Sequence, residues 1–151
     1  MTEIPTGLHT WLVLWRATRA VEARAYQSIE EAGLCPSDFG VLEALLHKGP
    51  LPVNVIGRKV LLTTGSITTA IDRLARRGLV KRKDDPDDGR VRLVELTAKG
   101  RQLIQPAFAR HAADLESLVA VLAPDERVAL VALLRKLGKA AQGELDDLDA
   151  N

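Results

Sequence analysis

The sequence has one cysteine and no long apolar run, and each absence excludes a class of protein. With Cys35 alone among 151 residues, the chain can form neither an internal disulfide nor a cysteine-based metal cluster. No stretch of about 18 uncharged apolar residues is present, which excludes a transmembrane helix. The N-terminal segment lacks the basic region and cleavage site of a secretory signal. We therefore expect a cytoplasmic protein with no membrane partner.

The net charge of +1 hides an uneven distribution of charge along the chain. Residues 52–101 carry 12 lysines and arginines against 6 acidic residues, whereas the remainder carries 9 against 14. A basic middle segment between acidic ends is typical of a nucleic-acid-binding module inside a neutral protein. The alternative is a solvated, charged helix face, and charge alone leaves that alternative open.

The middle of the chain has the pattern of a helix-turn-helix. Apolar residues at helical spacing predict helices over 37–48, over 52–60 and from about Thr64 to Arg77. Gly78 closes the third helix, and Thr63 and Thr64 are both good N-caps for it. The residues of that helix expected to face inward are Ile67, Ala70, Ile71 and Leu74. Two short helices joined by a tight turn, the second rich in Ser, Thr and Arg, have the outline of this motif.

The hydrophobic period then changes to that of strands. Residues 79–83 and 90–96 read as two strands, and the turn between them, 84–89, is rich in Asp, Pro and Gly. A two-stranded ribbon after the second helix of a helix-turn-helix is a wing.

Long helices with apolar stripes flank this lobe. One is predicted over 8–32 and ends at Gly33; another is capped by Thr97 and runs from about 98 to 122; the last begins at Pro124. Their apolar faces exceed what a small winged-helix core can bury, which predicts a homodimer. Its two reading helices would lie about one DNA turn, roughly 34 Å, apart on a pseudo-palindromic operator.

We therefore predict a mainly α fold with a small β-wing, forming a single unit over residues 1–151. It comprises a winged helix-turn-helix lobe at 35–96, dimerisation helices at 8–32 and 98–139, and an acidic tail at 140–151.

The run LLTTGSITTAIDRLARRGLVKRKDDPDDGRVRLVELTAKG (61–100) resembles the recognition helix and wing of the MarR family of bacterial transcriptional regulators. The most specific part is PDDGR, followed by a strand and then LTAKG. SDFGVLEALLHKG (37–49) and the C-terminal helices also fit, so the resemblance covers nearly the whole chain. Gly89 departs from the pattern, because the family often has a second arginine before the one that matches Arg90.

The resemblance implies a DNA-reading surface. Short hydroxyl side chains early in the recognition helix would reach bases or phosphates, and arginines further along would contact bases or backbone. Arg90 would enter the minor groove, where Asp88 would orient it. The predicted DNA-binding residues are Thr64, Ser66, Thr68, Thr69, Arg73, Arg77, Asp88, Arg90, Asn54 and Arg58. Simpler interpretations remain open: Thr64 as a cap, Asp88 as a turn former, and Arg77 as a solvated helix end.

Members of this family commonly bind small phenolic or lipophilic anions between the dimerisation helices and the winged helix. Aromatic side chains would stack on a ring, and Arg or His would pair with a carboxylate or phenolate. The candidate lining residues are Trp11, Trp15, Arg16, Phe39, His47, Phe108 and His111. Trp15, Phe39 and Phe108 also fit as ordinary core residues. The three histidines are widely separated in sequence, so no metal site and no cofactor is predicted.

The predicted function is a homodimeric repressor released by a small aromatic, phenolic or electrophilic ligand. One alternative is a winged-helix protein-interaction scaffold without DNA binding, although the retained basic residues argue against it. Another is a redox-sensing regulator based on Cys35, which precedes Pro36 at the start of a predicted helix. The sequence contains no phosphate-binding loop, metalloprotease motif or nucleophilic triad, so an enzyme is not expected.

Overall fold

The computed structural model describes residues 4–60 and 64–142, apart from the side chain of Thr64. The chain falls into two compact units that meet within one helix, the first ending at Asp114 and the second beginning at Leu115. The first unit contains all the strands and most of the helices. The bounds of the helices are α1 Gly7–Glu31, α2 Pro36–Lys48, α3 Val53–Lys59, α4 Thr64–Arg76, α5 Ala98–Val119 and α6 Pro124–Gln142.

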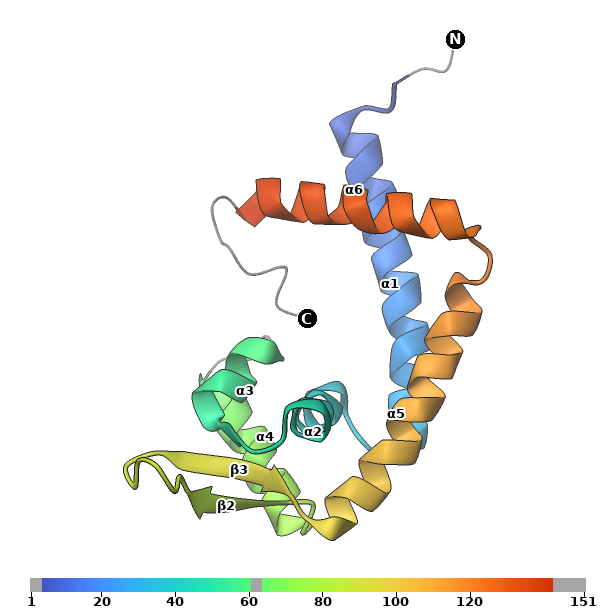
Figure 1. Ribbon diagram of the computed structural model, residues 1–151. Helices are drawn as coiled ribbons and strands as arrows, with labels where there is room; N and C mark the ends of the chain where they lie inside the picture. The colour runs from blue at the N-terminus through green and yellow to red at the C-terminus, as the bar shows by residue number, and fades with distance from the viewer. Residues whose placement is uncertain (1–3, 61–63, 143–151) are drawn as a thin grey trace. The chain divides into compact units, whose positions relative to one another are not determined.

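The strands form a small antiparallel sheet at the edge of the helix-turn-helix. β2 (Val80–Asp84) and β3 (Arg92–Leu96) pair as a hairpin, with Val80 opposite Leu96 and Asp84 opposite Arg92. β1 (Leu51–Pro52) adds to the other side of β3, which gives the order β1-β3-β2. Figure 1 shows α2, α3 and α4 grouped beside the hairpin, whose turn projects past them. We call residues 80–96 the wing.

The core of the first unit lies between these short helices and the sheet, and Ile29 of α1 and Ile104 of α5 are also buried in it. The buried apolar side chains include those predicted on the inward face of α4: Ile67, Ala70, Ile71 and Leu74. α2 contributes Phe39, Val41, Leu42 and Leu45. With no tryptophan or tyrosine buried among the described residues, aliphatic side chains and Phe39 fill this core.

The recognition helix α4 and the long helix α5 are joined by a tight contact at the LTAKG segment. Thr97 caps α5 by accepting a hydrogen bond from the Gly100 amide (3.0 Å), and its hydroxyl donates to the Gly78 carbonyl (2.6 Å) just past α4. Lys99 donates to the carbonyl of Arg77 (2.8 Å). A Cβ on Gly100 would lie 1.9 Å from the carbonyl oxygen of Leu79, so only glycine allows this approach. Gly78 itself has φ +70°, the left-handed conformation predicted at the end of α4.

The predicted fold class, a mainly α winged helix-turn-helix with long flanking helices, is confirmed, while several bounds differ. The two-residue strand β1 was not predicted, because two residues carry no recognisable period. α5 ends at Val119 rather than near 122, and α6 continues to Gln142, so the predicted acidic tail begins with helical residues. The proposed cap Thr63 and the side chain of Thr64 lie outside the described residues.

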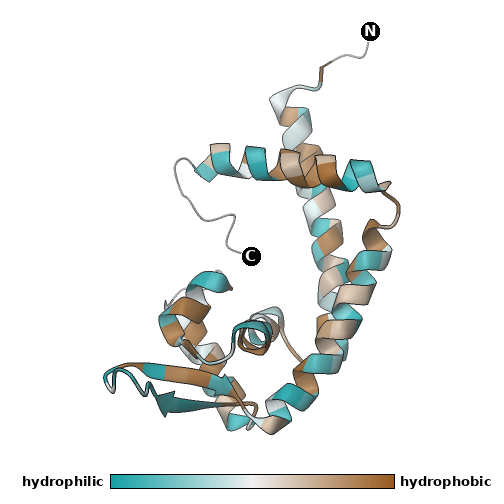
Figure 2. Cartoon of the chain, in the orientation of Figure 1, coloured by the Kyte–Doolittle hydropathy of each residue, from teal (hydrophilic) through white to brown (hydrophobic). Residues whose placement is uncertain are grey.

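The long helices carry large apolar side chains that face solvent. On α1 they include Leu8, Trp11, Leu12 and Trp15, which we call the N-terminal apolar stripe. α6 has no buried residue, although it carries Val128, Val131, Leu134 and Leu137 at helical spacing. Figure 2 colours much of α6 as apolar. None of the helices within the described ranges is long and apolar enough to cross a membrane.

Candidate nucleic-acid interface

The N-terminal half of α4 presents short hydroxyl side chains to solvent. Ser66, Thr68 and Thr69 are all exposed, as an interface with DNA requires. They are exposed because Ile67, Ala70 and Ile71 occupy the buried side of the same helix. The Thr69 hydroxyl donates to the carbonyl of Gly65 (3.0 Å), which fixes the rotamer of this side chain.

Arg73 lies one turn beyond Thr69 and is bound within the protein. Its Nε and Nη2 atoms donate to Oδ2 and Oδ1 of Asp38 on α2, at 2.9 and 2.5 Å. Asp38 is 2% exposed, and the Arg73 side chain is 39% exposed. The hydrogen bonds to Asp38 raise the pKa of Arg73 above its ordinary value. The residue predicted to contact DNA thus has its guanidinium held by a buried carboxylate.

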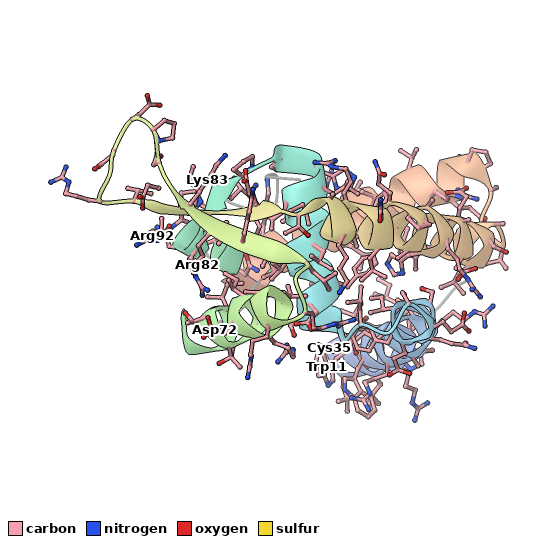
Figure 3. The ribbon with its side chains drawn as sticks, turned by 90° about the horizontal axis from the view of Figure 1, so that it is seen from below. Trp11, Cys35, Asp72, Arg82, Lys83 and Arg92 are labelled. Atoms are coloured by element: carbon pink, nitrogen blue, oxygen red, sulfur yellow. The ribbon has the colours of Figure 1, made fainter. Side chains whose placement is uncertain are left out.

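Other cations near α4 also have partners inside the lobe. Arg77 donates to the carbonyl of Gly33 at the end of α1 (3.2 Å), and Arg82 of β2 pairs with Asp72 of α4 (2.5 Å). Figure 3 shows Arg82 and Asp72 side by side between strand and helix. On the sheet, Glu95 binds both Lys81 (3.2 Å) and Lys83 (2.7 Å), and its hydrogen bond from Lys83 lowers the pKa of Glu95.

The turn of the wing holds Arg90 outward. The Arg90 side chain is 92% exposed, and its Nε donates to Oδ1 of Asp88 at 3.1 Å. The same oxygen accepts the backbone amide of Arg90 (3.1 Å), so Asp88 both shapes the turn and orients the guanidinium. These hydrogen bonds lower the pKa of Asp88, with the side-chain bond as the larger cause. The turn is also closed by the amide of Val91, which donates to the carbonyl of Asp88 (2.9 Å).

A hollow of about 530 Å³ lies between α3, α4 and β3. Its polar lining comes from Asn54 and Arg58 of α3, both among the predicted DNA-binding residues, and from Arg90 and Arg92. Figure 3 places Arg92 along the hairpin, where it pairs with Asp84 (3.1 Å). The hollow therefore brings cations of the helix-turn-helix and of the wing to one concave surface.

The predicted ligand-binding residues separate into two groups. Phe39 and His47 of α2 face His111 and Phe108 of α5, with ring centroids 4.9 and 4.6 Å apart; we call these four residues the aromatic cluster. Trp11, Trp15 and Arg16 are instead exposed on the N-terminal half of α1. His111 also lies 2.8 Å from the hydroxyl of Ser28 on α1. A helix rises about 1.5 Å per residue, so Trp15 lies about 20 Å along α1 from Ser28. One small ligand cannot touch both groups of a single chain.

Cys35 is exposed at the N-cap position of α2 and makes no capping hydrogen bond with its side chain. Its sulfur lies 3.2 Å from the hydroxyl of Ser37 and 3.5 Å from Nη2 of Arg73. The thiol that the sequence singled out is therefore next to the pair that joins α2 to the recognition helix.

A model of the MarR family matches residues 32–91, the segment that contains the helix-turn-helix and the wing turn. The HTH-type transcriptional regulator MhqR of Bacillus subtilis (strain 168) is 38% identical over 142 residues, which cover 94% of this chain and 97% of MhqR. The chain belongs to the MarR family. It is accordingly a DNA-binding transcriptional regulator and not an enzyme.

Solved structures of other MarR regulators are similar over most of the chain. BpsR of Bordetella bronchiseptica, whose DNA binding is regulated by 6-hydroxynicotinic acid, is 32% identical with a TM-score of 0.73, over 85% of this chain and 98% of BpsR. Sco3205 of Streptomyces coelicolor, a MarR family regulator crystallised with DNA, has a TM-score of 0.81 over 98% of this chain and 96% of its own, at 21% identity. The second likeness shows a shared fold.

Sequence analysis missed Asp38, Asp72 and Arg82, which hold the recognition helix in place. A signal for Asp38 was present: it lies three and four residues before Val41 and Leu42, on the buried stripe of α2. A charged residue on an apolar stripe indicates a buried partner, because an unpaired charge is too costly to bury. The partner, 35 residues later, had no such signal.

Proposed function

We propose that this MarR-family regulator is a homodimeric repressor that binds a pseudo-palindromic operator and is released by a small aromatic acid or phenol. The observation that carries the dimer is α6, a helix of 19 residues with a stripe of Val and Leu and no buried side chain. Fully burying a Val or Leu side chain contributes about 1.5–3 kcal/mol. Contiguous apolar surface left open on a folded chain marks an interaction site.

A second copy of the chain is the occupant that this function favours. The N-terminal apolar stripe of α1, which includes the 57% exposed Trp11, offers the same kind of surface as α6. A symmetric dimer would place two α4 helices about one DNA turn apart, roughly 34 Å, and so produce a pseudo-palindromic site.

The DNA contacts fall into two kinds. Ser66, Thr68 and Thr69 would meet the major groove, where hydroxyl groups pair with base edges or phosphates. The polar side chains of the hollow would bind the DNA backbone and the adjacent minor groove; they are Asn54, Arg58 and Arg90. Arg77 would contact the backbone only after leaving the Gly33 carbonyl.

The ligand site would combine the aromatic cluster with a neighbouring polar hollow. This hollow, about 190 Å³, is lined by Ser28, Arg24 and Arg110 together with Gln27, Glu31 and Asp114. An aromatic ring would stack against the cluster while its carboxylate or phenolate meets an arginine. The regulation of BpsR by 6-hydroxynicotinic acid supports this class of ligand. Trp11, Trp15 and Arg16 would have to reach the same site from the second copy.

Fluorescence anisotropy tests the ligand part, with a labelled duplex selected from random sequence by the chain itself. Salicylate or 6-hydroxynicotinic acid should raise the Kd for this duplex. A matched pair of variants separates the site from the DNA surface: Arg110→Gln should weaken the response, whereas Arg101→Gln, which changes an exposed arginine of the same helix, should leave it intact. If neither compound shifts the Kd at millimolar concentration, the proposal that the ligand is a small aromatic acid is contradicted.

A second candidate input is chemical modification of Cys35, favoured by the contact between its sulfur and Arg73. Alkylation would add bulk beside the Asp38–Arg73 pair and disturb α4. N-ethylmaleimide should then weaken DNA binding by the wild-type chain and leave Cys35→Ser unaffected. Equal inhibition of both proteins would rule out this input.

A further inference from the structure

Asp38 has an environment unlike that of the other described carboxylates. Among the residues that the structure describes, Asp38 and Ser28 are the buried polar side chains, and of these two only Asp38 is charged. It lies in the first turn of α2, where the helix dipole favours a negative charge. Both of its oxygens accept hydrogen bonds from Arg73, in the two-pronged geometry that gives an arginine–carboxylate pair its directionality.

Arg73 connects this buried carboxylate to the reading surface. It lies on α4 four residues after Thr69 and seven after Ser66, so the three side chains share one flank of the helix. The residue before Arg73, Asp72, pairs with Arg82 of β2, but there the carboxylate is 51% exposed, against 2% for Asp38. A pair with an exposed carboxylate holds a helix weakly, whereas a bidentate pair on a buried carboxylate defines both a distance and an orientation.

The same pair competes with any DNA contact by Arg73. To reach a phosphate, the guanidinium would have to release Asp38, which would remain charged, buried and without its partner. Leaving a buried charge unpaired is strongly unfavourable. Nη2 of Arg73 is further engaged by the hydroxyl of Ser37 (3.4 Å), so the side chain is held by more than one partner.

We propose that Asp38 is a positioning residue for DNA reading, which sets α4 against α2 through Arg73 and keeps the Arg73 guanidinium away from DNA phosphates. Sequence discrimination then depends on a carboxylate that never meets DNA. The inference rests on the proposed contacts of Ser66, Thr68 and Thr69, and it replaces a direct DNA contact by Arg73.

The test uses the full chain and two duplexes, one selected from random sequence by the wild-type chain and a shuffled duplex of the same composition. The variants are Asp38→Asn, Arg73→Gln, the double variant, and Glu22→Gln as the matched control. Glu22 accepts a hydrogen bond from the hydroxyl of Tyr26 on α1 (3.5 Å), so the control removes one carboxylate charge of the same unit at a residue outside the proposed DNA and ligand sites. Each protein is titrated at several salt concentrations, and circular dichroism verifies that it is folded.

In Asp38→Asn, the preference for the selected duplex should fall by about tenfold or more, the size of one lost base-pair discrimination. Because Arg73 is freed to contact a phosphate, the slope of log K against log[salt] for the shuffled duplex should become steeper by up to about 0.9 per chain. In Arg73→Gln, the preference should fall equally while the salt dependence stays that of wild type. Glu22→Gln should keep both the preference for the selected duplex and the salt dependence.

Two results would overturn the proposal. One is that Asp38→Asn keeps the wild-type preference for the selected duplex. The other is that the slope of log K against log[salt] becomes shallower by about 0.9 per chain in Arg73→Gln, because this change would indicate a lost phosphate contact. If a single variant does not fold, the double variant decides on the same salt criterion, because it leaves no unpaired charge buried. A wild-type chain that enriches no sequence at all would contradict the proposed function instead.

Discussion

Replacing Arg90 by alanine should weaken DNA binding without changing stability. The Arg90 side chain is 92% exposed and pairs with Asp88, itself at the surface. Exposed pairs of this kind contribute little to folding, so the unfolding transition should stay in place. A single groove contact, by contrast, is worth about 1–3 kcal/mol of binding.

The salt dependence gives the expected size more sharply. Each cation that displaces a counterion adds about 0.9 to the slope of log K against log[salt]. Between about 50 and 200 mM salt, one such contact accounts for about a 3.5-fold change in affinity, and the two wings of a dimer for about 12-fold. Arg90→Ala should therefore reduce the slope by about 1.8 if the chain binds as a dimer.

Anisotropy titrations of wild-type and variant chains across this salt range measure both quantities. Arg101→Ala is the matched control, since it removes an exposed arginine of α5 to which no DNA contact is assigned. Unchanged affinity and slope in Arg90→Ala would refute the assignment of the wing turn to the DNA surface. An equal loss in Arg101→Ala would reduce the effect to net charge.

Two further substitutions and one pH titration test the structure itself. Gly100→Ala should lower the free energy of unfolding by about 3 kcal/mol, because the new Cβ would lie 1.9 Å from the carbonyl oxygen of Leu79. The midpoint of thermal unfolding should therefore fall by about 6–12 °C. An unchanged midpoint would exclude the close approach. Cys35→Ser should stabilise the chain by about 0.5–1 kcal/mol in urea unfolding, since serine caps α2 where cysteine does not; no gain would mean the cap cannot form. Arg90 lowers the pKa of Asp88, so the stabilisation from their pair is present at neutral pH and is lost as pH falls through that lowered value. In Arg90→Ala, an NMR titration should find the pKa of Asp88 raised towards its ordinary value, and an unchanged pKa would refute the pairing.

The fold could be predicted from local signals, because amphipathic helices, glycine stops and an Asp-rich turn each leave a short-range pattern. Ile67 and Leu74 are buried as their spacing predicts, and Gly78 adopts its left-handed conformation. The outward position of Arg90 beside Asp88 could also be predicted from the sequence, since two nearby residues in one turn determine it.

The long-range pairs could not be predicted in this way. Arg73 reads as a free cation of the recognition helix, and only packing of α2 against α4 shows that Asp38 binds it. Similarly, Trp15 and His111 both looked like pocket residues, yet the straight path of α1 separates Trp15 from the Ser28–His111 contact. Counting arginines in a sequence overestimates the charge available to DNA, because several of them bind carboxylates and carbonyls within the lobe.

The most direct test of a dimeric, sequence-reading regulator is the mass of its DNA complex. Sedimentation of the chain with the selected duplex, in the presence of excess shuffled DNA, should give one duplex with two chains of 16.4 kDa each. The complex should persist against the competitor. One chain per duplex, or complete displacement by shuffled DNA, would contradict the account.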